Sequence, residues 1–406
     1  MASPSLRFDS LAVHAGREDL NELGVHAPPI DLSSTNPLPD VELGGLSYES
    51  MANGGEPGPG GNVYARLWNP TVARFESALA QLERAPASVA FASGMAAMSA
   101  TLLALSQVRK NAHVVAVRPL YGGTDHLLAS GFLGVETTFC DATGVARAMR
   151  PSTVLVVVET PANPTLDLVD IKAIVAAAGG VPVLVDNTFA TPVLQNPLEL
   201  GASLVLHSAT KFIGGHGDVV GGVVACGEDL AASLRRTRAI TGAVLHPLAA
   251  YLLHRGLTTL PVRVRAQQRS AMRLVEWLTG HPEVVRVHYP TNDPAWASLA
   301  GTQMRGPGSM LSAQLRGGPE QVDQVTRGVR LFTHAVSLGG VDSLIQSPSA
   351  LTHRPVAPEA RPRADLVRLS VGLEDVEDLE RDLAQALDSV PHGAGHPDAC
   401  GRLALR

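Results

Sequence analysis

The chain has 406 residues, of which 45% are hydrophobic and 17% charged, so it can bury one large core and more naturally builds two domains. This composition excludes disorder as its main state. The formal net charge is -6, and no run of basic residues could follow a phosphate backbone, which argues against a nucleic-acid binder. Cys140, Cys226 and Cys400 are far apart, so we expect no disulfide framework and a reducing cytoplasmic location.

The amino-terminal segment is predicted to form an arm. It is rich in Pro, Gly, Ser and Asn, and residues 53–62 contain so much glycine and proline that they cannot form a helix or a central strand. We therefore expect an extended arm or loop over residues 1–62 that leads to Tyr64.

Residues 90–226 alternate short β-branched runs with helical stretches of small residues. This alternation is typical of a parallel sheet covered by helices on both faces. The predicted strands are residues 113–117, 135–140, 153–159, 182–186, 204–207 and 222–226. The predicted helices are residues 94–105, 127–131 and 171–178. The uncharged run 91–108 contains several polar residues, so we interpret it as a buried helix and expect no membrane partner.

A domain boundary is expected near residue 260. Residues 262–279 have the period of an amphipathic helix, and Pro261 stands where a new element would start. A strand over residues 284–288 and a last helix over 376–387 suggest a smaller α+β domain. We thus expect an arm at residues 1–62, a large domain at 63–260 and a small carboxyl-terminal domain at 261–406.

A lysine and two hydroxyls follow directly on one predicted strand. Ser208, Thr210 and Lys211 would lie at the carboxyl edge of the sheet, where open α/β sheets bind ligands. A single lysine is most often solvated, as we expect for Lys110 and Lys172. Because this chain uses arginine for nearly all of its positive charge, Lys211 suggests a need for an amine that can lose its proton, to contact phosphate or to form a Schiff base.

Other polar residues are ambiguous when each is taken alone. Asp186 ends a predicted strand and could pair with a protonated pyridine nitrogen or cap a turn. Asn163 could contact a ligand or form a turn. The amides after Ser93 could bind phosphate at a helix amino terminus, although many helices begin with serine. The histidines lack the spacing of ligands, so no metal is expected.

The order of eight short runs is more specific than any one of them. They occupy residues 64–71, 93–97, 120–124, 159–165, 186–192, 207–211, 337–340 and 368–372. Together they resemble the cysteine and methionine metabolism family of pyridoxal-phosphate (PLP) enzymes, and the resemblance runs from about residue 13 to about residue 387. That family includes cystathionine γ-synthase, cystathionine γ-lyase, methionine γ-lyase and the O-acetylhomoserine sulfhydrylases.

The resemblance implies an aspartate-aminotransferase-like fold of type I, which is an α/β fold with a large, mostly parallel sheet and a smaller α+β carboxyl-terminal domain. It implies pyridoxal 5'-phosphate as cofactor and a small amino acid as substrate. It also implies a homo-oligomer, a tetramer built from dimers that share active sites.

The resemblance further assigns roles to residues. Lys211 would hold the cofactor covalently and shuttle protons, Asp186 would keep the pyridine nitrogen protonated, and Tyr121 would stack on the ring and act as the acid for the leaving group. The ring hydroxyl would be contacted by Asn163. The remaining residues implied to bind the cofactor phosphate are Gly94, Met95, Ser208 and Thr210, with Tyr64 and Arg66 from the neighbouring subunit.

The substrate carboxylate would be bound by Arg368, because guanidinium suits a bidentate contact, with Ser337 and Asn163 beside it. The implied reaction is γ-elimination of the carbon–sulfur lyase type on a sulfur-containing or other γ-substituted amino acid. The alternative is γ-replacement, as in cystathionine γ-synthase or an O-acetylhomoserine sulfhydrylase, including a specialised-metabolism substrate, because both reactions use the same residues.

Three positions depart from the common family pattern. Val336 stands where cystathionine-handling members usually have an acid, and in this it resembles the methionine γ-lyases. Gly123 stands where those lyases usually carry a cysteine. Val336 therefore favours a methionine γ-lyase, whereas Gly123 does not. We interpret Trp68 as a core or interface aromatic in preference to a wall of the substrate site.

Overall fold

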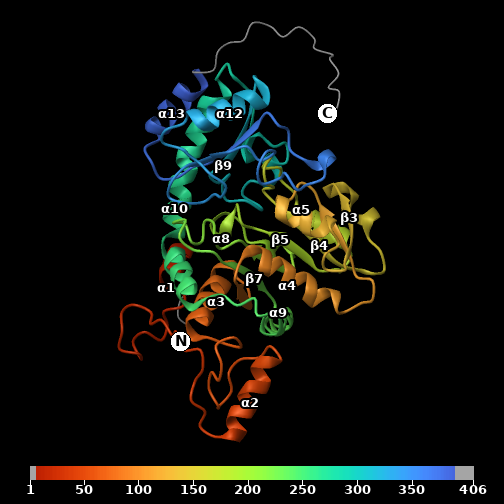
Figure 1. Cartoon of the computed structure of the whole chain (residues 1–406), viewed down its shortest axis with the longest axis vertical. Coiled ribbons are helices and arrows are strands. Elements are labelled where there is room, and N and C mark those ends of the chain that lie inside the picture. Colours follow the sequence, from red (N-terminus) through yellow and green to blue (C-terminus); the bar gives the residue numbers. More distant parts are fainter. Residues whose placement is uncertain (1–5, 389–406) are drawn as a thin grey trace, which may run out of the picture.

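The computed structural model describes residues 6–388 and contains a seven-stranded sheet in the order β1-β7-β6-β5-β4-β2-β3 (Figure 1). Strand β7 runs antiparallel to β1 and β6, and all other neighbours are parallel. Six of these strands were predicted to within one residue, whereas β1 was not predicted. The strands are β1 (Ala87–Phe91), β2 (His113–Val117), β3 (Glu136–Cys140), β4 (Thr153–Glu159), β5 (Val183–Asp186), β6 (Leu204–His207) and β7 (Gly222–Cys226).

Helices cover both faces of this sheet, which confirms the predicted α/β class. The side chains of β4 alternate between two cores: Leu155 and Val157 pack with α4 and α9, and Val156 and Val158 pack with α7. The helices of this part are α3 (Pro70–Glu83), α4 (Gly94–Ser106), α5 (Gly122–Ala129), α6 (Val145–Ala148), α7 (Ile171–Ala178), α8 (Thr191–Leu194) and α9 (Glu228–Thr241).

The expected start of α5 at residue 127 is wrong, because the helix begins at Gly122. Two consecutive glycines discourage a helix in the sequence, yet Gly122 is required by packing: a Cβ there would lie 2.2 Å from the carbonyl oxygen of Thr352. The uncharged run that raised the question of a membrane forms α4. Among residues 6–388, no helix is long and apolar enough to cross a membrane.

A second sheet of five strands, in the order β10-β11-β12-β9-β8, forms the core of the carboxyl-terminal part. This part confirms the predicted strand at residues 284–288 and the last helix. Its elements are β8 (Val284–His288), α11 (Trp296–Leu299), β9 (Met310–Leu315), α12 (Gly318–Gly328), β10 (Thr333–His334), β11 (Leu344–Gln346), β12 (Leu366–Ser370) and α13 (Val376–Asp388).

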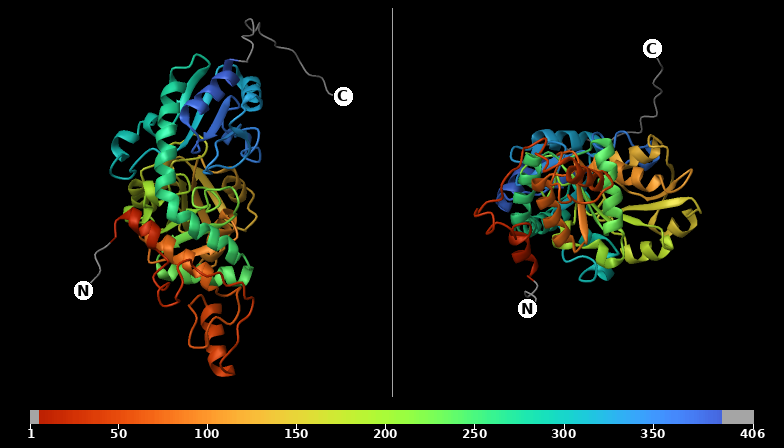
Figure 2. Two further views of the ribbon diagram at one scale, coloured as in Figure 1. Left: turned by 90° about the vertical axis from the view of Figure 1, so that its left-hand side faces the viewer. Right: turned by 90° about the horizontal axis from the view of Figure 1, so that it is seen from below.

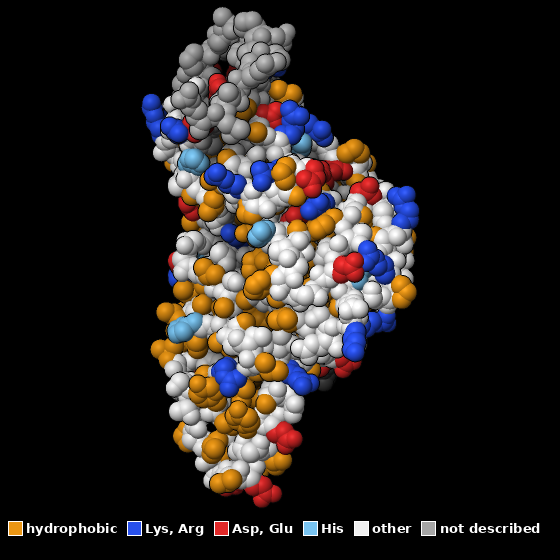
Figure 3. Space-filling model, turned by 45° about the vertical axis from the view of Figure 1, so that its right-hand side comes forward, with side chains coloured by type: hydrophobic (Ala, Val, Ile, Leu, Met, Phe, Trp, Pro, Cys, Tyr) orange, Lys and Arg blue, Asp and Glu red, His pale blue; other side chains and the backbone are white. Residues whose placement is uncertain are grey.

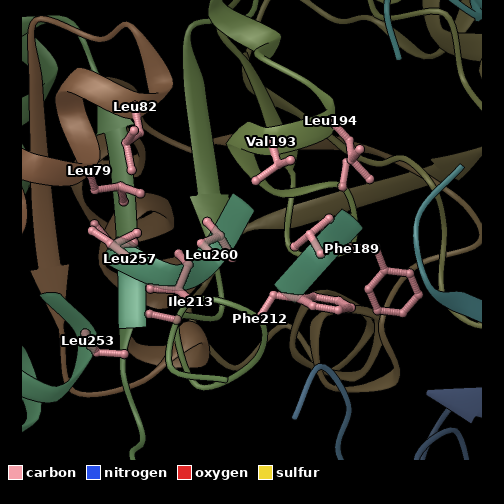
Figure 4. Packing of buried hydrophobic residues seen from close by; sticks show 14 of the residues in the cluster. Leu79, Leu82, Phe189, Val193, Leu194, Phe212, Ile213, Leu253, Leu257 and Leu260 are labelled. Atoms are coloured by element: carbon pink, nitrogen blue, oxygen red, sulfur yellow. The ribbon is translucent and has the colours of Figure 1, made fainter. Parts of the chain in front are cut away.

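A single long helix, α10 (Pro247–Thr279), joins the two parts (Figure 2). The expectation of a new element at Pro261 is wrong, because the helix continues through this proline. Leu253, Leu257 and Leu260 pack with α3 and with the segment after β6 (Figure 4), whereas Ala271 and Leu274 belong to the core of the second sheet. Burial of both halves offsets the cost of about 3 kcal/mol for an internal proline.

The division at residue 260 remains a proposal, and it falls inside this helix. The two cores meet along α10 between Val264, which packs with the first core, and Ala271, which packs with the second. We therefore propose that the large and small domains share α10 as their common element.

The amino-terminal arm contains two helices that the sequence did not predict, α1 (Phe8–His14) and α2 (Val41–Ala52). Helix α2 projects from the body of the protein at the bottom of Figure 1. Residues 53–62 form turns and loop, as expected. This loop packs against α2, because a Cβ at Gly60 would lie 2.1 Å from the carbonyl oxygen of Leu43.

Candidate active site

A cavity of about 340 Å³ opens at the carboxyl edge of the large sheet and is closed by residues of the small domain. Most of the site residues implied by the sequence line it: Gly94, Met95, Tyr121, Asn163, Asp186, Ser208, Thr210, Lys211, Ser337 and Arg368. Two residues of that set, Tyr64 and Arg66, do not line it. The volume is in the range of small-molecule sites in proteins.

The parallel strands place the carboxylates of this cavity side by side. Glu159 and Asp186 end β4 and β5 and are register partners, and Asp186 is also the register partner of Leu206 in β6. Ser208 and Lys211 follow where β6 ends. Three neighbouring strands thus deliver their polar ends to one edge, as expected for an open α/β sheet.

Lys211 lines the cavity and donates a hydrogen bond from Nζ to the hydroxyl oxygen of Ser337, at 2.8 Å. Burial and the positive charge of Arg368 lower the pKa of Lys211 to about 8. The neutral, nucleophilic form of the amine is therefore still the minor form at pH 7, but it is far more populated than at the ordinary lysine pKa of 10.5 and becomes the major form above about pH 8. Lys110 and Lys172 are exposed, as predicted.

Asp186 is held in place by the residue two positions later. The hydroxyl of Thr188 donates to its Oδ1 at 2.6 Å, and the Thr188 amide donates to the same oxygen at 3.0 Å. Burial raises the pKa of Asp186, which the two hydrogen bonds partly offset. A cationic ring nitrogen placed against this carboxylate would remove the penalty of burying its charge.

The amino terminus of α4 faces the cavity. The Ser93 side chain accepts from the Ala96 amide at 3.0 Å, and within residues 6–388 the amides of Gly94 and Met95 have no hydrogen-bond acceptor. A Cβ at Gly94 would lie 3.0 Å from the Cβ of Ser208, so a larger residue would push helix and strand end slightly apart. Free amides and the helix dipole suit a phosphate group.

Thr210 is engaged within the protein. Its hydroxyl donates to the carbonyl oxygen of Gly221 at 3.2 Å and accepts from the Gly221 amide at 3.1 Å. Ser208, whose hydroxyl lies beside the α4 amino terminus, is therefore the freer hydroxyl of the pair. Thr210 still lines the cavity.

Glu159 is a site residue whose role the sequence did not reveal. It is buried, and its two carboxylate oxygens accept from the amides of Tyr121, at 2.7 Å, and Asn163, at 2.8 Å. Burial and the adjacent Asp186 raise its pKa well above the ordinary value. A carboxylate at the end of a predicted buried strand was the signal that could have identified it.

Arg368 lies buried on β12 and reaches both sides of the cavity. Its guanidinium donates to Oδ1 of Asn163 at 2.9 Å and to the carbonyl oxygen of Ser337 at 2.8 Å. Burial lowers its pKa to about 10. Among residues 6–388 it forms no salt bridge with a carboxylate, so a carboxylate ligand would supply the missing counter-ion.

Tyr64 and Arg66 lie at the base of the arm. Arg66 donates to the carbonyl oxygen of Ala239 at 2.5 Å, and its guanidinium lies 5.6 Å from the centre of the exposed Tyr64 ring. The nearby Trp68 packs with Met51 and Leu67 and does not line this cavity. Its interpretation as a core or interface aromatic stays a prediction.

Comparisons with known proteins give the family. Residues 9–388 match the family described as Cys/Met metabolism PLP-dependent enzyme. An L-methionine gamma-lyase of Brevibacterium sandarakinum is 57% identical over 387 residues, covering 95% of this chain and 98% of that protein. An L-methionine gamma-lyase of Streptomyces avermitilis is 54% identical over 410 residues, covering 99% of this chain and 95% of its own length.

A solved structure of apo CalE6 from Micromonospora echinospora, described as a methionine gamma lyase, has a TM-score of 0.82 and 40% identity, and the match covers 94% of this chain and 99% of CalE6. Fold, cavity and sequence thus define an enzyme that uses pyridoxal phosphate. The chain belongs to the Cys/Met metabolism PLP-dependent enzyme family, and the prediction from its motifs is confirmed.

The cavity fits pyridoxal 5'-phosphate, the cofactor of this family. It presents a buried lysine amine, a carboxylate for the ring nitrogen and a helix amino terminus with free amides for the phosphate. Burial alone destabilises the carboxylate of Asp186, and a protonated ring nitrogen of the cofactor would explain best why a carboxylate lies there.

Proposed function

We propose that this enzyme is an L-methionine γ-lyase, which converts L-methionine and water into methanethiol, 2-oxobutanoate and ammonia. The names of the relatives at 54–57% identity support this proposal. The composition of the cavity supports it independently, because apolar side chains in the cavity wall favour an apolar γ-substituent on the substrate.

The observation that carries the substrate proposal is the apolar side of the cavity. Val336, Leu338 and Phe189 line it, and its only carboxylates within residues 6–388 are Glu159 and Asp186. Both carboxylates are engaged by backbone amides or hydroxyls at the strand ends. A methyl thioether suits such a wall, whereas the distal ammonium and carboxylate of cystathionine would lose water there without gaining a partner.

Bound pyridoxal phosphate supplies an electron sink that makes the protons on Cα and Cβ of the substrate acidic. We propose that Lys211 holds the cofactor and then carries protons at these two carbons, since its pKa of about 8 suits transfer in both directions near neutral pH. Asp186 pairs with the ring nitrogen, and Asn163 contacts the ring hydroxyl.

The remaining roles concern the phosphate, the substrate and the leaving group. Gly94 and Met95 bind the phosphate through their amides, with the hydroxyls of Ser208 and Thr210 beside them. Arg368 binds the substrate carboxylate, with Ser337 and Asn163 adjacent to it, and Tyr121 donates the proton to the departing thiolate. Tyr121 lines the cavity, and its amide is held by Glu159, which supports this last role.

We further propose a homotetramer built from dimers in which Tyr64 and Arg66 reach the cofactor phosphate of the partner subunit. The position of both residues outside their own cavity supports this arrangement. The exposed apolar side chains of the arm support it as well, among them Leu32, Val41 and Leu46, in the lower part of the molecule where Figure 3 shows hydrophobic side chains gathered. The unpaired Cys140 and Cys226 are consistent with a cytoplasmic enzyme.

The function is tested by following 2-oxo acid and ammonia with purified enzyme and a panel of L-methionine, L-homocysteine, L-cystathionine and O-acetyl-L-homoserine. Each substrate is assayed with and without added thiol. We expect L-methionine to be turned over without thiol and with a higher kcat/KM than L-cystathionine. Preference for cystathionine would make the enzyme a cystathionine γ-lyase, and a strict requirement for thiol would make it a γ-replacement enzyme.

A further inference from the structure

Arg263 on α10 is a buried cation whose partners are mainly backbone carbonyls. It is 4% exposed, and it donates at 2.7 Å to the carbonyl oxygens of Phe212 and Gly256. Further donor contacts go to Ile213 and to the hydroxyl of Thr259. Among residues 6–388, no carboxylate forms a salt bridge with it. A buried charge without a counter-ion is costly, so its position calls for a reason.

Two of the carbonyls that Arg263 binds, those of Phe212 and Ile213, belong to the residues directly after Lys211, whereas Gly256 lies on α10 itself. Phe212 and Ile213 are buried in the core that α10 forms with α3. The guanidinium therefore ties the segment that follows Lys211 to α10 through two hydrogen bonds, at 2.7 Å to Phe212 and at 3.4 Å to Ile213.

Gln267 lies one turn further along α10 and is fully buried. Its side-chain amide donates to the carbonyl oxygen of Gly340 at 2.6 Å. Gly340 ends the short segment that begins at Ser337, the residue whose hydroxyl accepts from Lys211. A single face of α10 thus binds the segment after Lys211 and the segment after Ser337.

These two segments also touch each other directly. A Cβ at Gly339, whose φ is +78°, would lie 2.7 Å from the amide nitrogen of Phe212. The Gly339 amide donates to the hydroxyl of Ser370 at 2.8 Å, which ties this segment to β12 and hence to the strand of Arg368. Because the two segments are packed this closely, a residue that binds both of them sets their relative position.

We propose that Arg263 and Gln267 form a brace on α10 that sets the position of Lys211 relative to Ser337. Both are positioning residues, because they act on the reacting groups only through the two segments. The inference rests on the proposed roles of Lys211 and Ser337. It also gives a reason why α10 continues through Pro261, because a break there would separate Arg263 and Gln267 from the half of the helix that packs with α3.

The test compares Arg263→Met, Arg263→Lys and Gln267→Met with wild-type holoenzyme, and Arg269→Met is the matched control because Arg269 is exposed on the same helix. Three quantities are measured: kcat and KM for L-methionine, the melting temperature, and the pH midpoint of the change in the visible absorbance of the bound cofactor. That midpoint reports the surroundings of Lys211, which shares its cavity with Tyr121, Glu159, Asp186 and Arg368.

We expect Arg263→Met and Gln267→Met each to lower kcat by about 10- to 100-fold with a smaller change in KM, since a displacement near 1 Å can cost about 100-fold. The absorbance midpoint should move upward, because a less firmly held lysine is less desolvated. Arg263→Lys should recover part of kcat, and Arg269→Met should match wild type.

If Gln267→Met leaves kcat within twofold and the midpoint unchanged, the brace is refuted, even if Arg263→Met fails to fold. A lower melting temperature in the folded variants without any change in the midpoint would also refute it, because the two side chains would then serve stability alone. The absorbance titration needs no substrate, so it decides the brace even if methionine proves not to be the substrate. Failure of Lys211→Ala to alter the cofactor absorbance would instead refute the proposed role of Lys211.

Discussion

The Nζ atom of Lys211 lies 2.8 Å from the hydroxyl oxygen of Ser337, although 126 positions separate the two residues. This contact joins the end of the large sheet to the small domain. From Ser337 the hydrogen bonds continue to Arg368 and then to Asn163, whose amide is held by Glu159. The groups proposed to bind cofactor and substrate are therefore positioned by one connected network.

Replacement of the lysine tests its assignment. Lys211→Ala should reduce turnover below detection while the protein still binds pyridoxal phosphate non-covalently, because Asp186 and the α4 amino terminus remain. The measurements are activity and the absorbance spectrum of the purified variant before and after dialysis. Lys172→Ala, at an exposed lysine, is the control and should behave as wild type. Substantial activity in Lys211→Ala would contradict the assignment.

The pKa of Lys211 predicts how the cofactor-free enzyme takes up pyridoxal phosphate. Only the neutral amine reacts, so the reloading rate should rise with pH, with a midpoint at about 8, and level off above it. Because the charge of Arg368 lowers this pKa, Arg368→Met should move the midpoint upward, whereas Arg368→Lys should keep it low. A midpoint near the ordinary lysine pKa of 10.5 in wild type would contradict the buried environment.

Tyr121 is expected to protonate the leaving thiolate. Tyr121→Phe should lower kcat for L-methionine by about 100-fold or more, which is the usual contribution of a general acid. The loss should be much smaller for O-acetyl-L-homoserine, because acetate leaves without a proton. Steady-state kinetics with the two substrates provide the comparison. Equal losses for both substrates would assign Tyr121 to ring stacking alone.

Glu159 should couple stability to pH in the cofactor-free enzyme. Burial and Asp186 raise its pKa above 4.5, so its favourable contribution is present below that pH and is lost as the pH rises through its pKa in the folded protein. The melting temperature of wild type relative to Glu159→Gln should therefore fall as the pH is raised from 4.5. We also expect kcat about 10- to 100-fold lower, because glutamine cannot accept from both amides. A pH-independent difference in melting temperature would show that Glu159 does not titrate as we expect.

The wall residue Val336 tests the preference for a thioether. Val336→Glu should lower kcat/KM for L-methionine by about tenfold or more and raise that for L-cystathionine, because a carboxylate disfavours the methyl group and can pair with the distal ammonium. Val336→Thr keeps the shape without adding a charge and is the control. An unchanged ratio between the two substrates would remove Val336 from the determinants of specificity.

Much of the large domain followed from the sequence, because buried parallel strands are short β-branched runs that have few other interpretations. The motifs likewise identified many of the residues that line the cavity, although not Glu159, and they included Tyr64 and Arg66, which do not line it. Two features were missed where tertiary packing overrides the local signal. Helix α10 continues through Pro261 because both of its halves are buried. Helix α5 begins at Gly122, where contact with the Thr352 carbonyl requires a glycine despite its low helix propensity.

The roles of Arg263 and Gln267 could not be predicted, because each depends on contacts between segments that are distant in the sequence. Gln267, for example, meets a carbonyl 73 positions away. Nothing in the local pattern of α10 distinguishes such a residue from other buried polar positions. Only the three-dimensional arrangement shows that one helical face binds the segments on both sides of the cavity.

We propose above all that this enzyme eliminates methanethiol from L-methionine. Purified holoenzyme should release methanethiol, 2-oxobutanoate and ammonia in equal amounts from L-methionine, with no added thiol and no release by Lys211→Ala. Absence of methanethiol, together with consumption of O-acetyl-L-homoserine only when a thiol is present, would contradict the claim and establish a γ-replacement enzyme instead.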